Sequence, residues 1–400
     1  MLLARFLSKL FNKEGIVLVD SRHQKYICGE LTNKEKPLTL KLLKSDLNWK
    51  LLVYPELYLG EEYYKGNIEI ENGTIHDFLN LALKNLDRGK VNIYSTIFNN
   101  FRYALQFLAQ HNFTKASKRN AQHHYDRGED IYDWMLDSTH RQYSCALFKD
   151  TSESLEQAQT NKLLHIGKKL DLKKGERVLE IGCGWGGAGR YYAKKFGCQV
   201  HGITLSQNQL NYCKEKAREL KLDNFLSYEL CDYREVKGKY KKIYNIGFYE
   251  HISPKFYKTF FNKIKNLLTD DGICLTHTIA SVNEPTPTNP FISKYIFPGG
   301  KVPTTSQITK AIEKTGLIIS GWESYIDMYN HTLDCWRERF LKNADKAKRK
   351  YGADFVRLWD FYLSSCSAAF KYADLLVYQI ETVKNFTSIP YRTRDHIYNN

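Results

Sequence analysis

The spacing of apolar and polar residues changes along the chain, and the change divides it into a shorter front part and a longer second part. Between Gly15 and about Gly73, short alternating segments such as IVLVD, WKLLVYPELYLG and GNIEIENG predict strands joined by turns. The HDFLNLALKNL segment that follows has the spacing of a helix. Residues 114–120 are polar and basic without an apolar face, which predicts a linker behind a front α+β domain at 1–113.

From Ala121 onward, long helical segments alternate with apolar strands. RVLEIG, CQVHGITL, KIYNIGFY and GICLTHTIA predict strands, and SQNQLNYCKEKAREL predicts one of the helices between them. This alternation is typical of a parallel sheet covered by helices on both faces. Residues 121–400 are therefore predicted to form a doubly wound, Rossmann-like α/β domain, with a mostly helical tail from His331 to about Phe386.

The opening segment MLLARFLSKL has apolar residues at helical spacing. They are Leu2, Leu3, Phe6, Leu7 and Leu10. With basic residues between them, they predict either a helix that lies in a membrane interface or one that packs on its own domain. Arg5 and Lys9 interrupt the run and no cleavage site of small residues follows, so a secretory signal is not expected.

Composition adds a strong positive charge to this picture. The 59 Lys and Arg residues outnumber the 44 Asp and Glu residues, and the net charge of +15 favours an acidic partner: nucleic acid, an anionic bilayer or an acidic substrate. No apolar run approaches the roughly 18 residues of a spanning helix, so contact with a membrane is expected at its surface. The nine cysteines form no C-x-x-C pair, which predicts a reduced, cytosolic setting without a disulfide framework or a metal site.

The stretch VLEIGCGWGG places Gly182, Gly184 and Gly187 directly after a predicted strand. Such a turn lets backbone approach a ligand closely, and the alternative is a purely structural turn. No Gly-Lys-Ser/Thr follows, which excludes a P-loop, and the second strand ends GITLSQNQ without the acid that a dinucleotide site needs. S-adenosylmethionine carries no phosphate, and LEIGCGWGG resembles the first motif of class I methyltransferases.

Polar residues after the first three strands are the predicted S-adenosylmethionine contacts, with helix capping by Thr204 or Ser206 as the alternative. They are Glu180, Thr204, Ser206, Gln209, Asp232 and Tyr233. Neighbouring positions complete the predicted set: Tyr143, Ser144, Cys183, Trp185, Gly186 and Arg234.

The methyl acceptor is not expected to be nucleic acid. Enzymes that methylate base nitrogens commonly place an Asn-Pro-Pro-Tyr turn after the fourth strand, whereas this strand ends GFYEHI. The nearest match, Asn289-Pro290-Phe291, falls beyond the next strand, and no base-reading module is present in the sequence.

A longer pattern points to lipid instead. Residues 124–148, HYDRGEDIYDWMLDSTHRQYSCALF, resemble the segment that precedes the cofactor fold in cyclopropane-fatty-acyl-phospholipid synthases. Further stretches agree with that family in the same order along the chain: GCGWGG with GITLSQNQ, FYEHI, HTIA, SKYIFPGGKVPT, YNHTLDCWRERF and YLSSCSAAF. The resemblance covers Ala121 to about Val383, and LYLGEEYYKGNIEIENGTIHDFL extends it loosely into the front domain. Glu129 replaces a usual Asn and Phe248-Tyr249 a usual Met-Phe, which could alter chain preference.

The resemblance implies transfer of a methylene from S-adenosylmethionine to the cis double bond of an unsaturated phospholipid acyl chain, with bound bicarbonate as the base that deprotonates a carbocation. The residues that would hold bicarbonate are Cys145, Glu250, His277, the backbone at Ile279, and Tyr329. Cys366 is a further candidate thiol, ranked lower because a thiolate would compete for the sulfonium carbon. Individually, Cys145 could be a small buried hydrophobe and His277 a satisfied core histidine.

The resemblance also implies a homodimer that docks on an anionic membrane from the cytoplasmic side. The front domain and the KGKYKK run, residues 237–242, are candidate contributors to that docking. Three alternatives stay open: a fatty-acid methyltransferase with a methyl-branched or hydroxylated product, a small-molecule N-methyltransferase, and a lipid-binding protein without activity.

Overall fold

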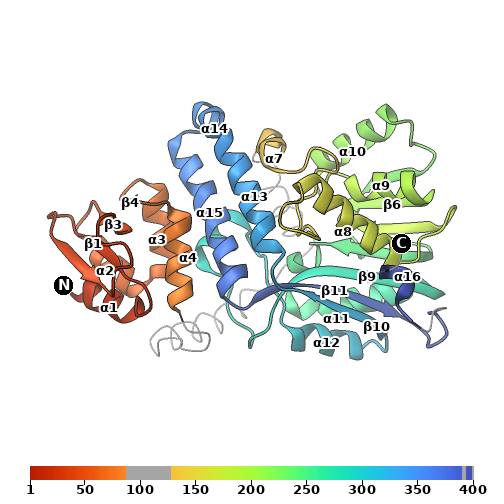
Figure 1. Ribbon diagram of the computed structural model, residues 1–400. Helices are drawn as coiled ribbons and strands as arrows, with labels where there is room; N and C mark the ends of the chain where they lie inside the picture. The colour runs from red at the N-terminus through yellow and green to blue at the C-terminus, as the bar shows by residue number, and fades with distance from the viewer. Residues whose placement is uncertain (87–127, 390–392, 399–400) are drawn as a thin grey trace. The chain divides into compact units, whose positions relative to one another are not determined.

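The computed structural model describes residues 1–86, 128–389 and 393–398, which form two compact units (Figure 1). The first unit comprises the described residues up to 86 with Thr286–Pro298 and Leu333–Asp374. The second comprises the described residues from 128 to Pro285, then Gly299–Thr332 and the part from Leu375 onward. The predicted linker at 114–120 lies outside the described residues, so that boundary stays a prediction.

The first unit contains a four-stranded sheet in the order β2-β1-β3-β4. Its strands are β1 (Ile16–Val19), β2 (Lys25–Cys28), β3 (Thr39–Leu42) and β4 (Ile68–Glu71), and its early helices are α1 (Leu2–Leu10), α2 (Leu47–Val53), α3 (Pro55–Tyr64) and α4 (Ile75–Asn85). The expected helix in HDFLNLALKNL is α4, which begins with a capping box between Thr74 and Asp77. Leu3, Ala4 and Leu7 of α1 are buried, as expected for a helix that packs on its own domain.

The strand predicted in WKLLVYPELYLG is wrong, because this stretch forms α2 and α3. Leu47 and Leu51, four residues apart, are the buried residues of α2, which is a helical period. Pro55 starts α3 at a position where the missing N–H removes no intrahelical hydrogen bond.

Later parts of the chain complete the core of the first unit. They are the π-helical turn Ile292–Ile296, most of α13 (Tyr329–Lys342), α14 (Ala344–Tyr351) and α15 (Ala353–Tyr372). Phe291 and Phe361 stack edge to face at 4.8 Å, and a Cβ at Gly60 would come within 2.5 Å of the Phe291 ring. Glu61 of α3 accepts hydrogen bonds of 2.7 Å from both Lys294 and Tyr295.

The second unit is built on a seven-stranded sheet in the order β10-β11-β9-β8-β5-β6-β7. Its strands are β5 (Arg177–Ile181), β6 (Gln199–Thr204), β7 (Leu226–Leu230), β8 (Tyr240–Ile246), β9 (Leu268–Ser281), β10 (Ile318–Tyr325) and β11 (Leu375–Val383). Strands β5 to β9 pair in parallel, whereas β11 runs antiparallel to β9 and β10. The described helices around the sheet are α7 (Glu129–Met135), α8 (Leu155–Lys169), α9 (Gly187–Phe196), α10 (Gln207–Glu219), α11 (Tyr257–Leu267), α12 (Thr305–Glu313) and α16 (Asp395–Tyr398). The predicted doubly wound α/β fold is confirmed.

The tail departs from its prediction at one element. Residues 375–383 form β11 inside the sheet, where a mostly helical tail was expected. Nearly the whole strand is buried, so its sequence lacks the polar-apolar alternation that identifies a half-buried strand.

The KGKYKK run is only partly available as a basic surface, because Lys237 and Lys239 are exposed whereas Lys241 is ion-paired and Lys242 is buried. Lys242 lies in β8 and is 3% exposed, and Lys241 pairs with Glu176 at 3.3 Å and with Asp271 at 3.4 Å. Within the part of the chain that the structure describes, no helix is long and apolar enough to cross a bilayer.

Candidate functional site

The glycine turn joins the end of β5 to α9 and requires glycine at several positions. Gly182, Gly184 and Gly186 have φ angles of +79°, +51° and +70°, in the left-handed region. A Cβ at Gly187 would lie 1.8 Å from the carbonyl oxygen of His140. At Gly184 a Cβ would meet no described atom within 4 Å, so the backbone there faces open space that a ligand can enter.

Glu180 supplies a buried carboxyl beside this turn. Among the described residues, its Oε2 has no hydrogen-bond partner. Burial raises the pKa of Glu180 to about 8, although the neighbouring Tyr244 hydroxyl and the positive charges of Arg190 and Lys162 oppose the rise. A buried polar atom without a partner suits a bound molecule that brings a hydroxyl or an ammonium group.

Thr204, Ser206 and Gln209 bind one another at the end of β6. Thr204 Oγ1 donates to Gln209 Oε1 at 2.8 Å and accepts from the Ser206 amide at 3.1 Å. Ser206 Oγ accepts from the Gln209 amide at 3.3 Å and thereby caps α10. The capping alternative is thus confirmed for Ser206, while a cofactor contact at these three residues stays a prediction.

Asp232 and Arg234 form a two-pronged ion pair after β7. The Oδ1–Nε and Oδ2–Nη2 distances are 2.8 and 2.7 Å. Burial raises the pKa of Asp232, but the hydrogen bonds from Arg234 outweigh it and lower the pKa below its usual value. Tyr233 stacks edge to face on Phe248 at 5.8 Å, and Phe248 also lies 2.6 Å from the Cβ position of Gly182. Phe248 therefore links Tyr233 to the glycine turn.

The loop that carries Tyr143, Ser144 and Cys145 is held by Lys162, which the sequence analysis did not identify. Lys162 is fully buried in α8, and its Nζ donates to Gln142 Oε1 and to Ser144 Oγ, both at 2.8 Å. Burial lowers the pKa of Lys162 to about 7, although nearby acidic groups oppose this decrease. Helical spacing is the sequence signal that could have identified Lys162. It lies on one stripe of α8 with the other buried residues Leu155, Gln159, Ile166 and Lys169.

Aromatic contacts connect the same loop to the glycine turn. Tyr132 contacts Tyr143 at 5.4 Å and Trp185 at 5.5 Å, and the guanidinium of Arg141 lies 4.0 Å from the centre of the Trp185 ring. Tyr143 and Trp185, predicted as cofactor contacts from distant parts of the sequence, therefore share Tyr132 as a neighbour.

Glu250 and Ile279, predicted to help hold an anion, are in direct contact. The Ile279 amide donates to Glu250 Oε1 at 2.6 Å, whereas Oε2 has no hydrogen-bond partner among the described residues. Burial raises the pKa of Glu250 to about 7, although the hydrogen bond from the Ile279 amide opposes the rise. His277, two positions before Ile279 in β9, receives a 3.2 Å contact at Nδ1 from the side chain of Gln379.

Cys145 and Tyr329 are connected through the start of α13. The Ala146 amide donates to Thr332 Oγ1 at 3.1 Å, and Thr332 lies one helical turn after Tyr329. Burial raises the pKa of Cys145 to about 12, so the group is a protonated thiol at neutral pH. Cys366 lies on α15 in the first unit, whereas Cys145 and Tyr329 lie in the second.

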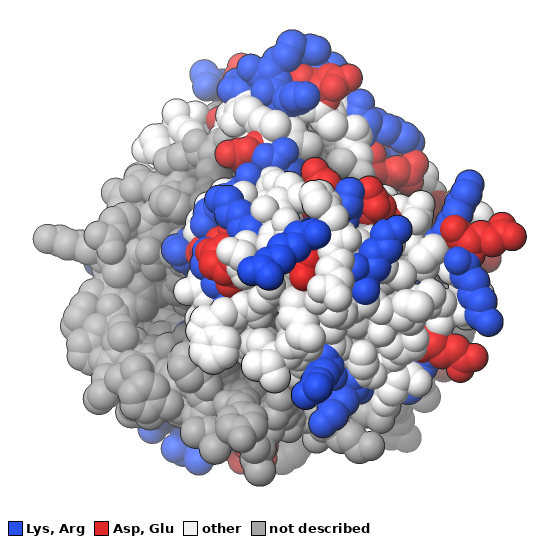
Figure 2. Space-filling view, turned by 90° about the vertical axis from the view of Figure 1, so that its left-hand side faces the viewer, with Lys and Arg blue, Asp and Glu red and all other residues white. Residues whose placement is uncertain are grey.

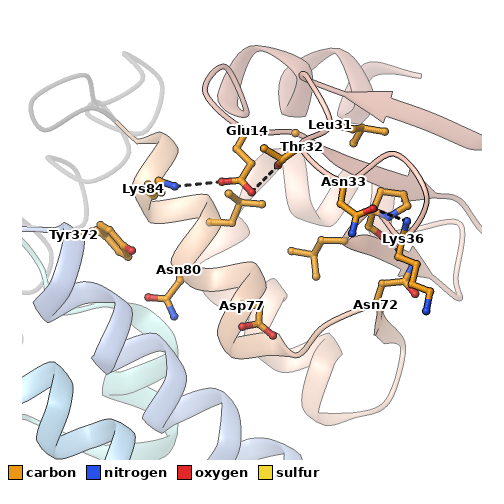
Figure 3. Close-up of a pocket in the computed structure, with 14 residues that line it drawn as sticks. Glu14, Leu31, Thr32, Asn33, Lys36, Asn72, Asp77, Asn80, Lys84 and Tyr372 are labelled. Carbon is orange, nitrogen blue, oxygen red and sulfur yellow. Dashed lines mark hydrogen bonds and ion pairs between the residues drawn. The ribbon is translucent and has the colours of Figure 1, made fainter. Parts of the chain in front are cut away.

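The first unit contains a separate polar hollow of about 390 Å³ (Figure 3). Asn33, Lys36, Asp77 and Asn80 are among its lining residues. Glu14 there binds Thr32 at 2.7 Å and Lys84 at 3.2 Å. No predicted site residue is part of this lining.

Comparisons with known proteins agree with the fold and with the sequence motifs. The mycolic acid cyclopropane synthetase family matches residues 112–380. The chain is 33% identical over 356 residues to the cyclopropane-fatty-acyl-phospholipid synthase of Escherichia coli (strain K12), covering 88% of this chain and 89% of that protein. It is 35% identical over 277 residues to sphingolipid C9-methyltransferase A of Emericella nidulans, covering 66% of this chain and 53% of that protein.

A solved structure of a cyclopropane synthase is also similar to this chain. The mycolic acid cyclopropane synthase CmaA1 complexed with SAH and CTAB is 29% identical, with a TM-score of 0.63 over 66% of this chain and 97% of that chain. The resemblance to cyclopropane synthases is thereby confirmed. With a family match over more than half of its length and a similar relative along most of it, the chain belongs to the mycolic acid cyclopropane synthetase family of methyltransferases.

Proposed function

We propose that this protein transfers a methylene group from S-adenosylmethionine to the cis double bond of an unsaturated acyl chain in a membrane phospholipid and forms a cyclopropane ring. The similarity to the Escherichia coli synthase along 88% of the chain supports the substrate class. The observation that carries the chemistry is Glu250, a buried carboxyl that binds the Ile279 amide and keeps one oxygen without a partner among the described residues.

The reaction requires strict positioning, because an isolated alkene is a poor nucleophile. Holding the sulfonium carbon in line with the double bond can supply about 7–11 kcal/mol. The open backbone at Gly184 and the buried carboxyl of Glu180 are the groups that would receive the donor molecule. The cation formed by methyl transfer must be kept from water, and an aromatic ring that faces it would stabilise it by about 0.5–2 kcal/mol.

The residues of the second unit suit a small bound anion. Cys145 is a protonated thiol, and Glu250, whose pKa is about 7, can carry a proton on its unpartnered oxygen. Both are then hydrogen-bond donors, and the Tyr329 hydroxyl would be a third. The Ile279 amide already donates to Glu250, so Glu250 holds its position through that bond. Bound bicarbonate would supply the base that takes a proton from the transferred methyl group.

The experiment uses the purified full chain, labelled S-adenosylmethionine and vesicles of unsaturated phospholipid, in buffer with or without bicarbonate. We expect label in acyl chains that gain CH2 and resist mild hydrogenation, with lower turnover in carbonate-free buffer. Glu250→Gln should lower turnover, and Glu215→Gln, at an exposed position of α10, is the matched control. Label in soluble amines alone, or turnover that ignores lipid, would contradict the proposal.

A methyl-branched product is the second candidate, favoured by the 35% identity to a sphingolipid C9-methyltransferase. In that case the cation loses a proton without closing a ring, and the product is an isomeric alkene. The isomers have equal mass, but only the alkene takes up hydrogen under mild conditions. The same incubation therefore separates the two functions.

We further propose that the protein works as a homodimer on the cytoplasmic face of an anionic membrane, docked by its first unit. Figure 2 shows Lys and Arg side chains on the face where this unit is drawn, with Asp and Glu side chains among them and uncharged surface between. Apolar side chains of this unit are exposed: Leu2, Ile27, Trp49 and Val53. Binding to anionic vesicles should weaken with added salt, and light scattering should give twice the chain mass.

A further inference from the structure

A row of buried polar side chains crosses the sheet of the second unit and ends at His277. The row is set by strand register, since His277 of β9 pairs with Gln379 of β11 and Gln379 pairs with Glu323 of β10. Lys169, at the end of α8, reaches the same row and donates from Nζ to Gln379 Oε1 at 2.7 Å. Its Nζ also lies 2.5 Å from Glu323 Oε2.

Lys169 fixes the orientation of the Gln379 amide. A lysine ammonium has three donors and no acceptor, so the amide oxygen of Gln379 must be the atom that faces it. The amide nitrogen then faces His277 Nδ1, 3.2 Å away, and an NH2 group can only donate. His277 Nδ1 must therefore accept, which it can do only without a proton of its own.

His277 is also held neutral. It is 3% exposed, and burial together with the positive charges of Lys162 and Lys169 lowers its pKa well below the usual value. A neutral imidazole carries one N–H, so a proton excluded from Nδ1 must sit on Nε2.

From this geometry we infer that Lys169 and Gln379 are positioning residues that hold His277 as its Nε2–H tautomer, a hydrogen-bond donor and not a base. The role in the reaction rests on the proposed function, in which His277 would donate from Nε2 to the bound anion. The anion, and not the imidazole, is then left to accept the methyl proton.

Glu323 anchors the row at its other end. Besides Lys169, its carboxylate receives hydrogen bonds from His165 at 2.8 Å, Arg394 at 3.2 Å and the hydroxyl of Tyr398. Arg394 in turn binds Glu381 of β11 at 2.7 Å. Because these bonds fix Glu323 from several elements, the position of Lys169, and through it the Gln379 amide, is fixed as well.

The inference can be tested without substrate. Long-range proton–nitrogen correlation spectra of the full chain with ¹⁵N-labelled histidine report which ring nitrogen carries the proton, and His277→Gln identifies the His277 signals by their loss. We expect the wild type to show the Nε2–H tautomer with no titration between about pH 6 and 8. In Gln379→Glu a carboxylate, which only accepts, replaces the amide, so the signals should change to the Nδ1–H tautomer.

Kinetics then give the functional consequence. Lys169→Met should lower kcat by about tenfold or more while the KM for S-adenosylmethionine stays unchanged, because the fault lies in orientation. Lys168→Met, the same change at the neighbouring position of α8, is the control for charge and folding.

An Nδ1–H tautomer in the wild type, or an unchanged tautomer in Gln379→Glu, would overturn the inference. Since the spectra need no substrate, they stand even if lipid methylation fails. Conversely, if the protein methylates lipid but His277 is found as the Nδ1–H tautomer, the inference fails and the proposed function stands.

Discussion

Replacement of Lys162 by methionine should lower the activity of the protein while changing the stability of the fold little. Wild-type Lys162 is fully buried, and its pKa falls from 10.5 to about 7 because of burial. At about 1.36 kcal/mol for each pH unit, keeping this ammonium charged in the folded protein costs about 5 kcal/mol. Methionine removes that cost. It also removes hydrogen bonds to Gln142 and Ser144, and a buried polar group left unpaired costs about 1–3 kcal/mol.

These opposing contributions nearly cancel. We therefore expect the free energy of unfolding of Lys162→Met to lie within a few kcal/mol of the wild-type value at pH 7. Turnover should nevertheless fall sharply, because the loop that carries Ser144 and Cys145 loses its anchor. Lys214→Met, at an exposed position of α10, is the control and should change neither quantity.

The pH dependence of stability tests the reasoning directly. The unfolded chain binds a proton at Lys162 up to about pH 10.5, but the folded chain loses it above about pH 7. Wild-type stability should therefore rise relative to Lys162→Met as pH increases, by about 2–3 kcal/mol between pH 7 and 9 in denaturant titrations. Titration of Lys169 is common to both proteins and cancels. A flat difference across this range, or full turnover in the variant, would refute the assignment.

Three further predictions concern the site. Gly184→Ala should weaken S-adenosylmethionine binding in calorimetry with a loss of stability of only about 1 kcal/mol, because its φ of +51° is strained but its surroundings are open. Glu250→Gln should stabilise the protein at pH 8 by about 3 kcal/mol and leave it unchanged near pH 4, because a carboxyl whose pKa is raised to about 7 destabilises the fold as pH rises. Cys366→Ser should retain turnover, whereas Tyr329→Phe should lose it. The reverse pattern would show that Cys366, and not the group of residues that includes Cys145 and Tyr329, takes part in the reaction.

Much of the second unit could be predicted from sequence because its signals are local. The strand before the glycine turn and the turn itself each depend on residues within a few positions, and both were expected. The cap at Ser206 is equally local and was the stated alternative to a cofactor contact there. The loop around Cys145 and the end of the sheet at Glu250 were reached through resemblance to a family. Lys162, whose Nζ holds that loop through Gln142 and Ser144, was not expected.

The missed features have one physical cause. Lys162, Lys169 and Gln379 are polar residues whose partners lie outside their own helix or strand. Lys162 binds residues 18 and 20 positions away, and Lys169 and Gln379 are 210 positions apart. A lysine in a helix normally indicates a solvated face. Helical spacing places Lys162 and Lys169 on the buried stripe of α8, but only tertiary contacts identify the groups that they bind. Strand β11 was missed for the related reason that its burial is uniform and not alternating.

The interleaving of the two units has a consequence for biosynthesis. Strand β11 lies between β9 and β10, yet it is synthesised after 42 residues, Leu333–Asp374, that belong to the other unit. Until Leu375–Val383 has left the ribosome, β9 and β10 have no strand between them, and His277 lacks Gln379. The nascent second unit therefore exposes two unpaired strand edges late in translation, a state in which chaperone binding or aggregation competes with folding.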